Sequence, residues 1–186
     1  MQPLPREPRA LFVGVLERYK NVDGLARAWS AVAARVPAAR LLVVGIGRER
    51  STIEELVRFS GGRVTWHERL SQAEVARALD ESTCLVLPSR SEGLPRIVIE
   101  AFCRGRPVVA SRSGGTPDIV RDGENGLLVR PGDDAALAEA LARILTDAAL
   151  AQRLASGAAA SADGWSQTPE EYAARIAELV AGVAAA

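Results

Sequence analysis

The sequence lacks an excess of charge of either sign. Lys and Arg together number 23, and Asp and Glu also number 23, so the formal net charge of the 186 residues is zero. A protein that binds nucleic acid usually carries a basic excess, so this balance disfavours a nucleic-acid partner. Any charge that binds a ligand must therefore be local.

Cysteines and long apolar runs are also scarce. Cys84 and Cys103 both lie within apolar segments, which predicts buried free thiols in a reducing cytosol rather than a disulfide. No apolar run approaches the roughly 20 residues of a transmembrane helix, and the Pro- and Arg-rich start contains no signal-peptide core. The length leaves room for one ordinary α/β domain, which we expect to be cytoplasmic.

Strand-like and helix-like runs alternate along the first two thirds of the chain. We expect strands at 10–15, 40–45, 64–67, 83–88, 107–111 and 126–129. We expect helices at 22–36, 49–59, 71–80, 96–104, from about 116, and at 133–145, 147–160 and 169–183. Both faces of most strands are apolar, so the pattern predicts an α/β fold. We expect a doubly wound, Rossmann-like parallel sheet of about six strands with flanking helices and a helical C-terminal tail.

In open α/β sheets, ligands bind beyond the carboxyl ends of the strands. Four loops are predicted to meet at that edge, whatever the strand order: 15–21, 45–48, 89–95 and 113–116.

Two carboxylates in this region, Glu92 and Glu100, stand eight positions apart. Glu92 closes the polar loop after the fourth strand, and Glu100 lies in the next helix, so a helical rise places them roughly 12 Å apart at most. That spacing suits two hydroxyl-bearing parts of one elongated ligand, such as the two sugars of a nucleotide-sugar. It is too wide for one metal ion or a shared proton. Alternatively, Glu100 is a salt-bridged or solvated helix residue.

Other loop residues suit an anionic ligand. Lys20, with Arg18 two residues earlier, follows the first strand, where a cation can grip a phosphate or simply be a surface charge. Gly93 and Pro95 flank a helix start, where free N–H groups favour an anion. The pair 114–115 is either a second close backbone approach to a ligand or a flexible connection.

Two further features are weaker indicators. Gly45 and Gly47 follow the second strand but lack the third glycine of a dinucleotide fingerprint, which disfavours an NAD-dependent oxidoreductase. Trp66 and His67 end the third strand, where a base can lie against them. His67 is the single histidine, so no triad or metal cluster can be built around it.

Taken together, these residues resemble the C-terminal, donor-binding domain of GT-B-fold retaining glycosyltransferases. They are most similar to glycosyltransferase family four, the glycosyl transferases group 1 domain. The segments FVG…K, ARLLVVGIG, TCLVLPSRSEGLPRIVIEAF, GRPVVASRSGGTPDIVRDGENGLLV and PGDDAALAEALARIL follow the family order. Glu92 and Glu100 match the family's E-x7-E signature, and the resemblance runs from about Ala10 to Val180.

The resemblance implies a hexosyl transfer from a nucleotide-sugar, UDP- or GDP-linked, with no metal. Glu100 would bind the ribose and Glu92 the hydroxyls of the transferred sugar. Lys20 would neutralise the diphosphate leaving group, where charge develops as the glycosidic bond breaks. Lys20 and Glu92 are thus the expected catalytic residues. The expected donor-binding residues are Gly14, Arg18, Gly45, Gly47, Trp66, His67, Gly93, Leu94, Pro95 and Glu100.

The chain also departs from the family pattern. The family usually has an arginine directly after Gly14, where this chain has Val15, and we hypothesise that Arg18 supplies the second cation. Asp118 stands where a glutamate is common.

The domain organisation is a second departure, because a GT-B enzyme has two such domains. We expect residues 1–186 to form the C-terminal domain alone, with a core at 9–164 and a crossover segment and last helix at 165–186. The absent N-terminal domain would carry the acceptor site, so this chain by itself would be inactive. The last helix would dock on its own domain or on a second copy, and the full-length protein would be cytoplasmic or peripheral at a membrane.

Three other functions remain open from the sequence. A non-catalytic nucleotide-binding module, or a degenerate transferase, is supported by Val15. An NAD-dependent oxidoreductase and a sugar-nucleotide epimerase of GT-B architecture fit the motifs less well.

Overall fold

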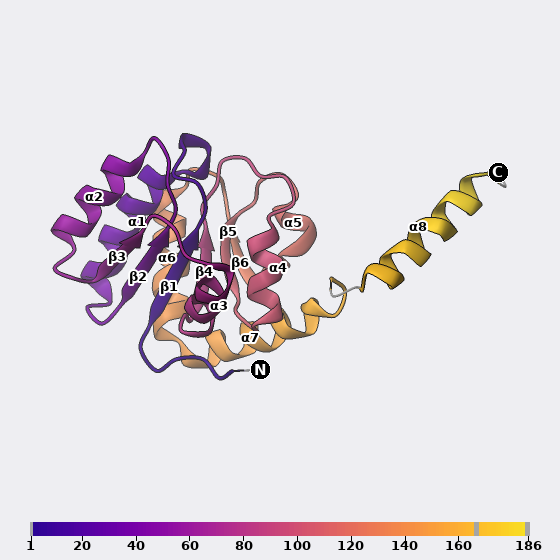
Figure 1. Cartoon of the computed structure of the whole chain (residues 1–186). Helices are drawn as coiled ribbons and strands as arrows, with labels where there is room; N and C mark the ends of the chain where they lie inside the picture. Colours follow the sequence, from indigo (N-terminus) through magenta and orange to yellow (C-terminus); the bar gives the residue numbers. More distant parts are fainter. Residues whose placement is uncertain (1, 166–167, 185–186) are drawn as a thin grey trace.

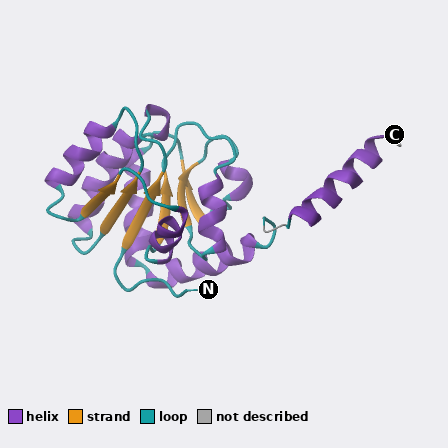
Figure 2. Cartoon of the chain, viewed as in Figure 1, coloured by secondary structure: helices purple, strands orange, loops and turns teal. Residues whose placement is uncertain are grey.

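A single parallel sheet forms the centre of the molecule. The computed structural model describes residues 2–165 and 168–184. Six strands lie in the order β3-β2-β1-β4-β5-β6, and every pair is parallel (Figures 1 and 2). The strands are β1 (Arg9–Val13), β2 (Arg40–Val44), β3 (Val64–His67), β4 (Cys84–Leu87), β5 (Val108–Ser111) and β6 (Gly126–Val129). The predicted doubly wound fold is confirmed, and the strand order reverses between β1 and β4.

Helices cover both faces of this sheet (Figure 1). They are α1 (Val22–Arg35), α2 (Arg50–Phe59), α3 (Gln72–Asp80), α4 (Arg96–Cys103), α5 (Thr116–Ile119), α6 (Asp134–Thr146), α7 (Ala148–Ala162) and α8 (Pro169–Ala184), with a short 3₁₀ helix η1 (Arg18–Lys20). One buried cluster joins the sheet to α1, α2 and α6. A second joins the opposite face to α3, α4 and α5, and α7 contributes to both clusters.

Burial of both sheet faces explains why the central strands are uniformly apolar. Successive side chains of a strand point to opposite faces, so Phe12 enters the first cluster and Leu11 the second. All four residues of β4 and of β5 are buried. The predicted parallel, two-sided sheet therefore follows directly from the lack of polar alternation.

Helix α3 begins with a capping box. The Ser71 side chain accepts a hydrogen bond from the backbone N–H of Glu74, and the Glu74 carboxylate accepts one from the backbone N–H of Ser71. Two N–H groups that a helix start leaves unpaired are thereby satisfied. The capping box fixes one wall of the cavity described below.

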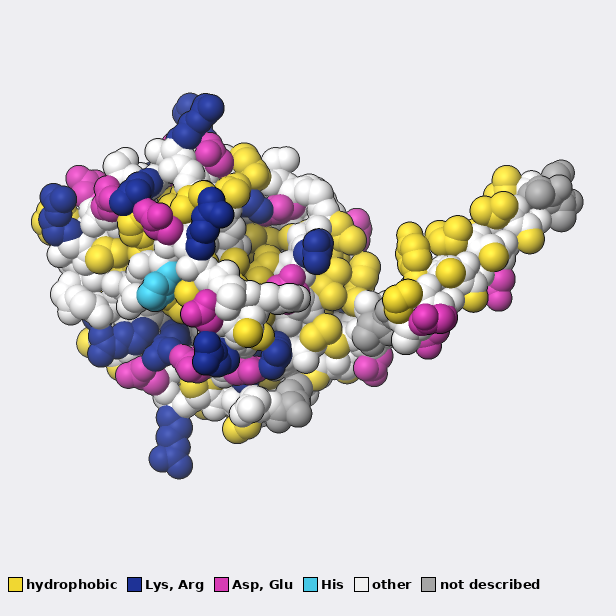
Figure 3. Space-filling model, in the orientation of Figure 1, with side chains coloured by type: hydrophobic (Ala, Val, Ile, Leu, Met, Phe, Trp, Pro, Cys, Tyr) yellow, Lys and Arg dark blue, Asp and Glu magenta, His cyan; other side chains and the backbone are white. Residues whose placement is uncertain are grey.

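Helix α8 stands apart from the sheet and its helices (Figure 1). Its large apolar residues are exposed, and hydrophobic side chains are visible along its length in Figure 3. They are Tyr172, Ile176, Leu179, Val180 and Val183. None of the helices in the described part of the chain combines the length and apolarity needed to cross a membrane.

Candidate active site

The four predicted loops meet at the carboxyl edge of the sheet, held together by backbone hydrogen bonds. The Leu16 N–H donates to the Ile46 carbonyl at 2.8 Å, which joins the loops after β1 and β2. The Arg90 N–H donates to the Tyr19 carbonyl at 2.7 Å, which joins the loops after β1 and β4. The loops after β4 and β5 are joined by a bond of 3.1 Å from the N–H of Gly115 to the carbonyl of Gly93. The edge is thus one continuous surface built from four strand ends.

The pair Gly114–Gly115 holds the loop that carries Glu92. Gly114 has a φ of 52°, and a Cβ at this position would collide with the backbone carbonyl of Glu92. The Ser113 hydroxyl donates to the Ser89 carbonyl at 3.0 Å in the same contact. These glycines therefore let two loops pack backbone to backbone, which fixes the position of Glu92.

Lys20 and Glu92 form a direct ion pair at this edge. Lys20 Nζ lies 2.6 Å from Glu92 Oε1, and their side chains are 14% and 8% exposed. The same carboxylate oxygen accepts a hydrogen bond of 2.6 Å from the Ser89 hydroxyl. Lys20 is the sole lysine among the 23 Lys and Arg residues, and it is held by a carboxylate rather than free on the surface.

Sequence analysis missed Ser89. Its spacing of three residues before Glu92, in the segment SRSE, is the signal that could have found it.

The start of helix α4 faces the same edge without a side-chain cap. Its N-cap residue is Pro95, which makes no side-chain cap hydrogen bond. A Cβ on Gly93 would meet nothing within 4 Å, and Leu94 is 53% exposed. The first N–H groups of a helix and its dipole attract an anion when no side chain satisfies them.

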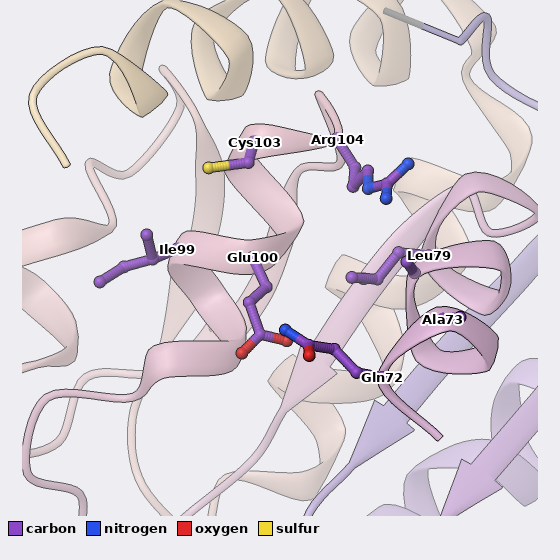
Figure 4. A pocket seen from close by; sticks show the side chains of 8 residues that line it. Gln72, Ala73, Leu79, Ile99, Glu100, Cys103 and Arg104 are labelled. Carbon is purple, nitrogen blue, oxygen red and sulfur yellow. The ribbon is translucent and has the colours of Figure 1, made fainter. Parts of the chain in front are cut away.

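Glu100 lines a cavity between α3 and α4. The cavity has a volume of about 460 Å³ and is lined by Gln72, Ala73, Ala76, Leu79, Ile99, Glu100, Cys103 and Arg104. The side chains of Glu100 and Gln72 point toward one another across its mouth (Figure 4). The Glu100 carboxylate has no salt bridge within the described residues. Glu100 is exposed, which agrees with the solvated-helix alternative and also leaves its carboxylate accessible to a ligand.

The two cysteines lie in different surroundings. Cys84 is buried, and burial raises the pKa of its thiol to about 12. Cys103 is exposed, contrary to the prediction that both thiols are buried. It falls one turn after Glu100, on the side of α4 that borders the cavity, because α3 and α4 leave a gap there.

Trp66 and His67 face opposite sides of the sheet. The indole of Trp66 packs with the first cluster, donates to the Gly45 carbonyl at 2.9 Å and lies under the Arg50 guanidinium, 5.0 Å from the ring centre. His67 is exposed at the end of β3, on the face that carries α3 and α4. Only His67 therefore shares a face with Glu100.

The remaining predicted residues lie along the loops after β1 and β2. Gly14, Gly45 and Gly47 are at the carboxyl edge, and the Gly14 N–H donates to the Val44 carbonyl at 3.0 Å. Arg18 is exposed in η1, two residues before Lys20, and its side chain has no ion-pair partner within the described residues. Val15 is 42% exposed beside it.

No group of three or more His, Cys, Asp or Glu side chains that could hold a metal ion is found in residues 2–165 and 168–184.

The sequence profile of one family, described as glycosyl transferases group 1, matches residues 7–147. The chain belongs to this family. It corresponds to the C-terminal domain of such enzymes, as the resemblance predicted.

Known relatives agree with this assignment. The D-inositol 3-phosphate glycosyltransferase of Streptomyces griseus is 32% identical over 185 residues, which cover 90% of this chain and 39% of that enzyme. The sucrose-phosphate synthase of Thermosynechococcus elongatus superposes with a TM-score of 0.81 at 33% identity, over 97% of this chain and 46% of that one. This chain thus spans less than half the length of these relatives.

A second solved structure, which contains bound ligands, has a similar fold. Anabaena HepE, solved in complex with UDP and glucose, superposes with a TM-score of 0.78 at 24% identity, over 93% of this chain and 48% of that one. At this identity the similarity shows the fold alone.

Proposed function

We propose that this chain is the donor-binding half of a retaining glycosyltransferase, which transfers a hexosyl unit from a nucleoside-diphosphate sugar to an acceptor. The observation that carries the proposal is the Lys20–Glu92 pair beside the uncapped start of α4, with Glu100 in a cavity farther along the same helix. The complex of HepE with UDP and glucose supports this class of donor.

The diphosphate would lie between Lys20 and the start of α4. A lysine ammonium and the free N–H groups of a helix start both stabilise negative charge, and that charge grows on the diphosphate as the glycosidic bond breaks. The backbone of Gly93, Leu94 and Pro95 would border the diphosphate and the sugar, since this segment is open to solvent. We expect no metal to be required.

The transferred sugar would bind the Glu92 carboxylate. Oε1 of Glu92 accepts from Lys20 and Ser89, whereas Oε2 has no hydrogen-bond partner among the described residues. An ionised carboxylate accepts several hydrogen bonds, so Oε2 is open to sugar hydroxyls.

The nucleoside would occupy the mouth of the cavity between α3 and α4. Glu100 would accept hydrogen bonds from the ribose hydroxyls. The base would lie toward His67, which is on the same face of the sheet as Glu100. Trp66 would border the base only from the edge of β3, because Arg50 covers its ring. This region would determine whether the donor sugar is linked to UDP or to GDP.

Arg18 would supply the second cation of the diphosphate site, because this chain has Val15 where the family usually has an arginine. Its position in η1 beside Lys20 supports this role. Alanine at Arg18 should lower the affinity for a nucleoside diphosphate, while alanine at Arg58, exposed in the last turn of α2, should not. Equal affinity in both variants would remove Arg18 from the site and favour a degenerate, non-catalytic nucleotide-binding module.

The acceptor site would lie in a preceding domain of a longer protein, since this chain spans 39% of the Streptomyces relative. The apolar side of α8, with Tyr172, Ile176 and Leu179, would cover part of that domain or of a second copy. Sedimentation of this chain should reveal self-association that Ile176→Glu with Leu179→Glu abolishes. A monomer at all concentrations would contradict the second-copy docking. Such a protein would work in the cytoplasm or at the surface of a membrane.

The binding site can be mapped by NMR. On titration with UDP or GDP, we expect amide shifts in loops 14–20 and 93–96 and near Glu100 and His67. Amides of α6 and of the second half of α7 should not move. Shifts confined to α6, α7 or α8 would contradict the proposed donor site.

A further inference from the structure

A buried arginine lies at the opposite edge of the sheet from the donor site. Arg106 directly precedes Pro107 and β5, at the amino end of that strand. Its relative exposure is 0%, and it is among the largest fully buried side chains of the molecule. The proposed donor chemistry makes no use of it.

The hydrogen bonds of Arg106 run to the start of the chain. Nη2 donates to the backbone carbonyls of Gln2 and Pro3, at 3.1 and 3.2 Å. Its Nε and Nη1 are buried and have no partner among the described residues. Burial lowers the pKa of Arg106, and the nearby charge of Asp80 opposes this effect.

Such an arrangement does not favour stability. Asp80 uses Oδ2 to bind Arg104 at 2.8 Å, while its Oδ1 is buried without a partner, so it does not complete the bonding of Arg106. A buried charge with unsatisfied N–H groups costs free energy, and an apolar side chain of similar volume is often equal or better. Stability therefore does not explain why an arginine is buried here. Its two hydrogen bonds to the start of the chain indicate another role.

Those bonds hold what we call the leading segment, residues 2–8. Three of its seven residues are prolines, which stiffen the backbone. Leu4 packs against the first cluster, and the Pro8 carbonyl accepts from the Arg40 N–H at 2.9 Å. Arg106 is thus the outermost anchor, and it ties the segment that leads into β1 to the start of β5.

We propose that Arg106 is a positioning residue, which fixes the leading segment along the amino edge of the sheet and sets the direction from which a preceding domain joins this one. The enzymatic consequence rests on the proposed function. In a two-domain transferase the acceptor must meet Lys20 and Glu92 with fixed geometry, and a rigid leading segment limits how the two domains can approach.

The first test uses this chain and NMR relaxation of the leading segment. Arg106→Met should lower the heteronuclear NOE of the Leu4 and Arg6 amides to values typical of a mobile terminus, with the melting temperature unchanged or raised. Arg106→Lys, which keeps the positive charge on a single ammonium group, should give an intermediate NOE. The control Arg104→Met removes an arginine two residues away whose ion pair is with Asp80 and which makes no hydrogen bond to the described part of the segment, and it should leave both NOE values unchanged.

An ordered leading segment in folded Arg106→Met would overturn the proposal. If Arg106→Met does not fold, Arg106→Lys decides instead, and NOE values equal to those of wild type would then exclude a positioning role for Arg106.

The second test uses the longer enzyme that the proposed function implies. Arg106→Met should lower kcat by roughly tenfold or more, as small misplacements far from the chemistry do, with nucleotide affinity and donor KM unchanged. Arg106→Lys should restore part of kcat. An unchanged kcat would overturn the positioning role, whereas failure of wild-type protein to bind any nucleoside diphosphate would instead overturn the proposed function.

Discussion

Lys20 and Glu92 are 72 residues apart in the sequence and 2.6 Å apart in the structure. One follows β1 and the other follows β4, the two strands between which the sheet order reverses. The cation proposed to bind the diphosphate and the carboxylate proposed to bind the sugar therefore neutralise each other before any donor arrives. A bound diphosphate would compete with Glu92 for the Lys20 ammonium, and this competition has measurable consequences.

Removing the charge of Glu92 should release Lys20. Glu92→Gln is expected to raise the affinity for a nucleoside diphosphate about tenfold, which corresponds to roughly 1.4 kcal/mol. The preference for the nucleotide-sugar over the free diphosphate should fall, because the sugar loses its carboxylate. Titration calorimetry of both ligands measures this, with the exposed Glu124→Gln as control. Weaker diphosphate binding by Glu92→Gln would mean that the pair does not compete with the ligand.

Removing the charge of Lys20 should weaken diphosphate binding. Lys20→Met is expected to lower the affinity for a nucleoside diphosphate by roughly tenfold or more, and that for the nucleoside much less, since a charge-assisted contact to phosphate is lost. The double variant with Glu92→Gln separates this loss from repulsion by the unpaired carboxylate. Equal losses for nucleoside and diphosphate would place Lys20 away from the phosphates.

Much of the fold could be predicted because its signals are local. Apolar strands alternate with amphipathic helices, and the Ser71–Glu74 capping box starts α3 where expected. The Lys20–Glu92 bond could not be predicted from the residues alone, because it depends on strand order and on the packing of Gly114 against the Glu92 backbone. The 3₁₀ turn that positions Lys20 left no sequence signal that we recognised.

Single side chains were harder to predict than elements. Cys103 follows an apolar run, yet it is exposed because α3 and α4 leave a cavity between them. Trp66 and His67 are adjacent, but strand alternation sends them to opposite faces. The position of Arg106 gave no hint of burial, because its partners lie about a hundred residues earlier in the chain.

The two thiols should react at very different rates. Burial raises the pKa of Cys84 to about 12, and its thiolate is inaccessible, while Cys103 is exposed. At pH 8 an excess of dithionitrobenzoate should therefore modify one thiol of the native chain quickly and the second only in denaturant. Cys103→Ser should remove the fast phase. Two fast thiols in the native chain would contradict the buried position of Cys84.

Modified Cys103 also reports on the cavity. A bulky maleimide there should weaken nucleotide binding, because Cys103 lies one turn from Glu100. Methylthiolation is the small-group control and should have little effect.

The capping box should make the stability of α3 depend on pH. Hydrogen bonds from the Ser71 side chain and backbone lower the pKa of Glu74 below its ordinary value of 4.5. Because the pKa of Glu74 is lower in the folded state than in the unfolded state, its carboxylate stabilises the fold fully above the unfolded-state pKa. This stabilisation is lost as the pH falls through the folded-state pKa. Urea unfolding should thus find Glu74→Gln less stable than wild type at pH 7 and equal to it near pH 2. Glu55→Gln should show no such difference, and a difference that persists at low pH would argue against the capping role.

Nucleotide binding with and without the Glu100 carboxylate tests the central claim most directly. We would titrate the chain with UDP, GDP and ADP by calorimetry, and repeat each titration with Glu100→Ala. We predict that one nucleotide binds and that the substitution weakens it by roughly tenfold or more, since hydrogen bonds to a carboxylate are worth about 1.5–3 kcal/mol each. Absence of binding by all three, or binding that Glu100→Ala leaves unchanged, would contradict the assignment of the donor site.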